Sequence, residues 1–121
     1  MSENFELGPL QTQWLEALES GKYEQGLQRL KINNKYCCLG IVCELAGLAH
    51  DGFSRFISPE GRHNAHLPHY LAEQYGFFSD DGVVDGDSSD SLVRRNDSGS
   101  SFAEIAAFIR ANPKSVFKKA A

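Results

Sequence analysis

Two regions of the sequence carry side chains that suit a small anionic ligand. One lies just before an expected helix and holds Arg94, Arg95, Asn96 and Asp97. The other holds an aromatic ring and an amide, Tyr23 and Gln25. Arginine pairs with phosphate through parallel hydrogen bonds, aromatic rings stack on bases, and amides read the edge of a base. These six residues form the predicted ligand-binding site; no catalytic residue and no metal ligand is assigned.

Both regions could also serve only to build the fold, and this alternative to ligand binding stays open. Residues 94–97 could equally form a loop with an Asx turn and solvated arginines. Backbone N–H groups at the start of the helix that follows could instead hold an anion. In Gln25-Gly26, the glycine lets either a ligand or another backbone approach closely.

Three cysteines, Cys37, Cys38 and Cys43, offer a second kind of chemistry. The preferred interpretation is that they pack as small apolar core residues. A zinc site would need four ligands at workable spacing, and this pattern lacks them. Cys38 beside a helix start could have a lowered thiol pKa and act as a nucleophile, but no partner base is evident.

Histidines and acids gather in the middle of the chain. His63, His66 and His69 are expected in a surface loop and at the start of the next helix. Residues 80–90 hold five aspartates and no basic side chain. The spacing does not match a calcium-binding loop, so we expect either a solvated acidic loop or a surface that a partner protein contacts.

Composition limits the classes of function. The chain has 121 residues, 41% of them hydrophobic, and a net charge of −4. That length fits one domain, and the acidic balance disfavours general nucleic-acid binding. A polar, acidic start, the lack of a long apolar run and the odd cysteine count together predict a cytoplasmic location and no membrane contact.

Hydrophobic periodicity and capping residues predict mixed secondary structure. Helices are expected at residues 9–20, 40–46, 68–75 and 102–111, the last with a Ser101/Glu104 capping box. A hairpin is expected at residues 23–39, turning at Asn33-Asn34. Residues 50–66, with a short strand near 53–57, and residues 79–91, with Val83-Val84 as a candidate short strand, are expected to be loops. We therefore predict one α+β domain, residues 1–121, with about four helices on a small antiparallel sheet and a frayed tail at 118–121.

Several of these segments resemble a small protein family common in tailed phages and prophages. The resemblance rests on residues 14–18, 20–26, 36–40, 43–46 and 96–106, which read WLEAL, SGKYEQG, YCCLG, CELA and NDSGSSFAEIA. It covers about half of the chain, at its two ends. It implies a phage accessory protein made in a bacterial host cell, of a kind that often counters host defence.

The leading expectation is a phage counter-defence protein that binds and sequesters a small anionic, nucleotide-type host signal without catalysis or a cofactor. The alternative is an inhibitor of a host defence protein that uses the acidic loop at 80–90. A small enzyme using Cys38 or a histidine is the third hypothesis. The sequence leaves open whether the protein is a homo-oligomer.

Overall fold

The computed structural model describes residues 5–121, and this part of the chain folds into six helices and eight short strands. The helices are α1 (Pro9–Glu19), α2 (Cys38–Leu45), α3 (His69–Tyr75), α4 (Leu92–Asp97), α5 (Phe102–Ala111) and α6 (Pro113–Val116). The four predicted helices are α1, α2, α3 and α5. The α+β class and the single domain of the prediction are confirmed.

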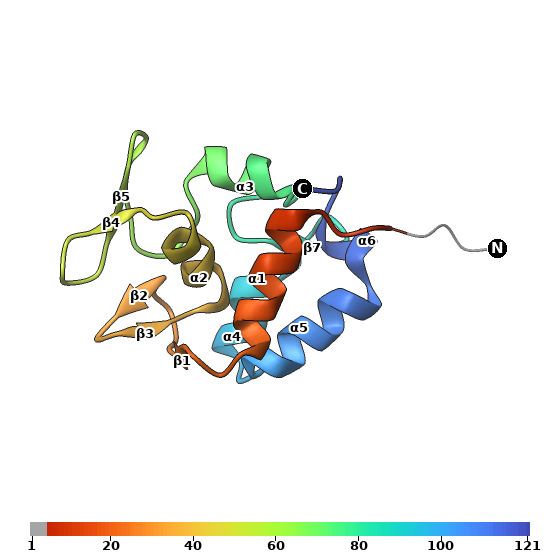
Figure 1. Ribbon diagram of the computed structural model, residues 1–121, viewed down its shortest axis with the longest axis horizontal. Coiled ribbons are helices and arrows are strands. Elements are labelled where there is room, and N and C mark those ends of the chain that lie inside the picture. The colour runs from red at the N-terminus through yellow and green to blue at the C-terminus, as the bar shows by residue number, and fades with distance from the viewer. Residues whose placement is uncertain (1–4) are drawn as a thin grey trace.

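The strands form three small sheets. β1 (Glu24–Gln25), β3 (Lys35–Tyr36) and β2 (Lys31–Ile32) make one, in that order, and β1 pairs in parallel with β3. β4 (Ala49–His50), β5 (Phe56–Ser58) and β6 (Gly61–His63) make an antiparallel second sheet. β7 (Val83–Val84) and β8 (Asp87–Ser91) form a hairpin. Strands β2 to β5 lie at one end of the molecule, and α5 and α6 lie at the other (Figure 1).

Local signals explain the elements that were predicted. Ser101 Oγ accepts a hydrogen bond from Glu104 N, and the Glu104 carboxylate accepts one from Ser101 N, so the predicted capping box is confirmed. Gly76 ends α3 in the left-handed conformation that glycine adopts without strain. Asn33 and Asn34 both have positive φ and form the two-residue turn between β2 and β3.

The prediction of loops was wrong for much of both central segments, whereas the short strands expected near residues 53–57 and at Val83-Val84 overlap β5 and β7. Residues 50–66 contain β5, β6 and the end of β4, and residues 79–91 contain the β7–β8 hairpin. The hairpin turns at Asp85-Gly86, and both residues have positive φ. An Asp-Gly pair is a strong sequence signal for this type of turn. Residues 94–97 are helical, because Ser91 caps α4 by accepting a hydrogen bond from Arg94 N.

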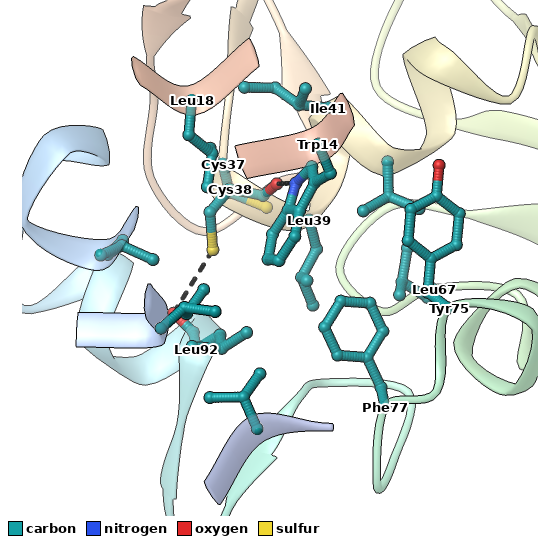
Figure 2. Close-up of a cluster of buried hydrophobic side chains, with 14 of the residues drawn as sticks. Trp14, Leu18, Cys37, Cys38, Leu39, Ile41, Leu67, Tyr75, Phe77 and Leu92 are labelled. Carbon is teal, nitrogen blue, oxygen red and sulfur yellow. Dashed lines mark hydrogen bonds between the residues drawn. The ribbon is translucent and has the colours of Figure 1, made fainter. Parts of the chain in front are cut away.

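The core forms where α1 and α2 meet the segment around Phe77. Trp14 is fully buried, and its ring meets Phe77 edge-on at 5.3 Å between centroids. The indole Nε1 donates a hydrogen bond to Cys38 O at 2.9 Å, which satisfies its only polar atom (Figure 2). The first helix is thereby fixed to the start of α2.

The C-terminal tail, predicted to fray at residues 118–121, is instead hydrogen-bonded to the body of the protein. Gln11 is completely buried, and its Nε2 donates to both Tyr75 O and Lys119 O at 2.8 Å. Gln11 N donates to Ala121 O, and Lys118 N donates to Gly76 O. One buried amide thus joins α1, the end of α3 and the tail.

Candidate functional site

Gln25 and Asn96, which are 71 residues apart in the sequence, contact each other directly. Gln25 Nε2 donates a hydrogen bond to Asn96 Oδ1 at 2.8 Å. Asn96 is completely buried; its Nδ2 donates to Gly26 O, and its Oδ1 also accepts from Cys38 N. We call Gln25, Gly26, Cys38 and Asn96 the polar corner. It joins β1, α2 and α4 through fully used amide groups.

Gln25 also extends the polar corner to the start of α5. Its Nε2 donates to Ser100 O at 2.7 Å, and its Oε1 accepts from Phe102 N at 3.1 Å. Glu104 N is taken by Ser101 Oγ. The N–H groups of Phe102 and Glu104, two of the first three residues of α5, are therefore used within the protein and are not available to an anion.

Tyr23 and Asp97, two other predicted ligand residues, make contacts of their own. The Tyr23 ring meets Tyr36 edge-on, with 5.3 Å between centroids. Asp97 Oδ1 accepts a hydrogen bond from Gln28 N at 2.9 Å, which fixes a residue with positive φ. Asp97 also lines a surface hollow, whereas Tyr23 packs beside the core.

The two arginines of α4 differ sharply. Arg95 is bound by both Asp90 oxygens, at 3.0 and 2.9 Å, and its Cζ lies 3.9 Å from the centre of the Phe108 ring. Arg94 is exposed, and its side chain makes no hydrogen bond or ion pair with residues 5–121. Only Arg94 of this pair is available to a ligand.

Arg94 lies on the rim of a shallow depression of about 340 Å³. The lining residues come from the segment before β7, from β8 and from α4, and they are Asp81, Ser88, Ser91, Val93, Arg94, Asp97 and Ser98. We call this hollow the Arg94 depression. It combines one guanidinium, two carboxylates and several hydroxyls, so it offers both a cation for an anionic group and acceptors for hydroxyl or amino groups.

The acidic segment 80–90 is less free than its sequence indicated. Asp80 Oδ1 lies 3.1 Å from His69 Nδ1, Asp81 accepts from Ser79 Oγ, and Asp90 binds Arg95. Asp87 accepts from both N and Oγ of Ser89, which lowers the pKa of its carboxyl. Asp85 and Asp87 remain as exposed carboxylates at the hairpin turn.

The surroundings of the three cysteines do not support the hypothesis that Cys38 is a nucleophile. Cys38 begins α2, but its side chain is completely buried and its Sγ points at Leu92 O (Figure 2). Burial raises the pKa of the Cys38 thiol well above its ordinary value, and it raises the pKa of Cys37 to about 11. Burial likewise raises the pKa of Cys43. The core interpretation of the three cysteines is confirmed, and the prediction of a lowered Cys38 pKa is wrong.

We expect the three thiols to resist alkylation in the native protein. The thiolate is the reactive form, and burial both suppresses it and blocks access. Iodoacetamide at pH 8, followed by mass spectrometry, should add no label to native protein within an hour and three labels in urea. Rapid native labelling of Cys38 would contradict this expectation.

The histidines are dispersed rather than clustered. His63 Nε2 lies 2.7 Å from Ser58 Oγ across the β5–β6 hairpin, and His69 contacts Asp80. Within residues 5–121, no group of three histidine, cysteine or acidic side chains is placed to hold a metal ion. In the same residues, no helix is long and apolar enough to cross a bilayer.

Comparisons with known proteins give a partial match. Residues 8–55 are similar to a family described as a domain of unknown function (DUF8296). No curated protein and no solved structure matches the chain. The matched segment runs from the residue before α1 into the turn between β4 and β5, so it includes Gln25 and Cys38 of the polar corner but not Asn96.

Proposed function

We propose that this protein captures a small anionic ligand of the nucleotide type and holds it without catalysis. The observation that carries the proposal is Arg94, an exposed arginine that has no side-chain partner among residues 5–121 and borders a depression. A guanidinium in this setting can form parallel hydrogen bonds with a phosphate.

The carboxylates of the Arg94 depression determine which anion fits. Asp81 and Asp97 would repel a bare multivalent anion, but they accept hydrogen bonds from hydroxyl and amino groups. A nucleotide carries both kinds of group, because its phosphate is anionic while its ribose and base supply donors. Ribose hydroxyls are commonly bound by a carboxylate in nucleotide sites.

The resemblance to tailed-phage proteins supplies the biological setting of the proposal. In that setting, the protein would sequester a host signalling nucleotide, such as a cyclic nucleotide or an ADP-ribose derivative, and so blunt a defence response. The alternative, an acidic surface that binds a host protein, has less support because Asp80, Asp81 and Asp90 already make internal contacts.

The test is a thermal-shift screen against bacterial signalling nucleotides, followed by calorimetry of the best binder. A ligand at 100 times its Kd should stabilise the protein by about 2.7 kcal/mol. Arg94→Gln should weaken that ligand by at least about tenfold, because a hydrogen bond to a charged group contributes about 1.5–3 kcal/mol.

Arg55→Gln is the matched control, since Arg55 is an exposed arginine outside the Arg94 depression. It makes the same change in net charge and should leave the affinity unchanged. Equal losses in both variants, or no stabilisation by any nucleotide at millimolar concentration, would refute the proposal.

A further inference from the structure

A second hollow is lined by residues of the β2–β3 turn and of the β4–β5 turn. The strands that carry these turns lie at the same end of the molecule (Figure 1). The volume of the hollow is about 410 Å³, and its lining consists of Lys31, Asn33, Asn34, His50, Gly52 and Phe53. We call it the hairpin groove. It shares no lining residue with the Arg94 depression, and its volume falls within the usual range for small-molecule sites.

The charged and titratable groups of the hairpin groove are already satisfied. Lys31 Nζ lies 3.6 Å from Glu44 Oε1 and 5.1 Å from the centre of the Tyr36 ring. His50 Nδ1 accepts a hydrogen bond from Gly52 N, so its Nε2 is the protonated nitrogen and donates to Lys31 O. With the lysine balanced and the imidazole neutral, the groove has no free charge to offer and suits an uncharged ligand.

The free groups of the groove are one aromatic face and two amides. Phe53 is 74% exposed, far more than any other large hydrophobic side chain of residues 5–121. Its loop is held in place because Asp51 Oδ1 accepts hydrogen bonds from the backbone N–H groups of residues 53, 54 and 55. The Asn33 and Asn34 side chains are exposed and make no hydrogen bond within residues 5–121.

We infer that the hairpin groove binds a free nucleoside through its base, with Phe53 stacking on the ring and an asparagine amide reading its edge. A planar base stacks on an aromatic side chain whatever its identity. An asparagine amide presents one donor and one acceptor side by side, which matches the N6 and N7 atoms of adenine. The net charge of −4 disfavours a polynucleotide as the source of the base.

Titration of the ¹⁵N-labelled protein with adenosine and with inosine tests this inference by heteronuclear NMR. Inosine keeps the stacking surface but replaces the N6 donor with an acceptor. Adenosine should give saturable shifts at residues 33, 34 and 53 and should bind at least about fivefold more tightly than inosine. Because Phe53 is exposed, Phe53→Ala should fold normally and bind adenosine at least about fivefold more weakly.

Phe53→Tyr is the matched control, because it preserves the aromatic face and should retain the affinity within about twofold. Asn33→Ala and Asn34→Ala identify the amide: one of them should abolish the preference for adenosine over inosine. Saturable shifts that Phe53→Ala leaves unchanged would overturn the stacking assignment. The absence of any saturable shift with adenosine at its solubility limit would overturn the inference.

Discussion

Replacing Gly40 with alanine is expected to destabilise the folded protein by about 3 kcal/mol or more, at the upper end of overpacking effects. A Cβ atom at this position would lie 1.7 Å from Leu30 O and 2.6 Å from Leu30 C. The Leu30 backbone cannot easily retreat, because its carbonyl accepts from Cys37 N and its N–H donates to Asn64 O. Gly40 therefore allows α2 to lie directly against the chain that enters β2.

Chemical unfolding followed by fluorescence measures this effect, since Trp14 is the single tryptophan and is fully buried. Gly21→Ala is the control: Gly21 has φ +75° but nothing within 4 Å of an added Cβ. It should lose only about 1 kcal/mol, from backbone strain alone. If the two variants lose the same stability, close packing at Gly40 is not the cause.

The second large effect is expected for Asn96→Ala, which should lower the free energy of unfolding by about 3 kcal/mol. The substitution leaves Cys38 N and Gly26 O without their partner and removes one of two acceptors from Gln25 Nε2. A buried polar group left unpaired costs about 1–3 kcal/mol. Ser98→Ala, at the exposed end of α4, should change stability by less than about 0.5 kcal/mol.

A double-mutant cycle shows whether the polar corner acts as one unit. Gln25→Ala alone should also destabilise the protein, because Phe102 N and Ser100 O lose their partner. The double variant should lose less stability than the sum of the losses of the two single variants, by a coupling energy of about 1 kcal/mol or more. Strict additivity would show that Gln25 and Asn96 contribute independently.

The polar corner gives a structural role to residues from three separate segments of the chain. Gln25-Gly26, Cys38 and Asn96 meet through hydrogen bonds shorter than 3.3 Å. Five of the six predicted ligand residues make internal contacts; they are Tyr23, Gln25, Arg95, Asn96 and Asp97. Arg94 and Asp97 are the two that line the Arg94 depression.

Local chemistry was enough to predict the elements whose determinants lie within a few residues. The Ser101/Glu104 box, the Asn33-Asn34 turn and the Gly76 helix end each depend on neighbours in the sequence. The same reasoning applied to Asp85-Gly86 would have indicated the β7–β8 hairpin. That signal was missed because residues 87–90 are polar throughout and show no alternation of apolar and polar side chains.

Only the tertiary structure decided which polar side chains are free. Asn96 and Arg94 both follow Ser91 in one short helix, yet one faces Gly26 and Cys38 and the other faces solvent. Arg95 pairs with Asp90 and is covered by the ring of Phe108. Nothing in the sequence around Arg95 indicates either contact. The sequence by itself determined an α+β fold, its main helices and its buried thiols, because these depend on local patterning and hydrophobicity. Which side chains remained available for a ligand depended on tertiary contacts, such as the hydrogen bond between Gln25 and Asn96 across 71 residues, which no local pattern encodes.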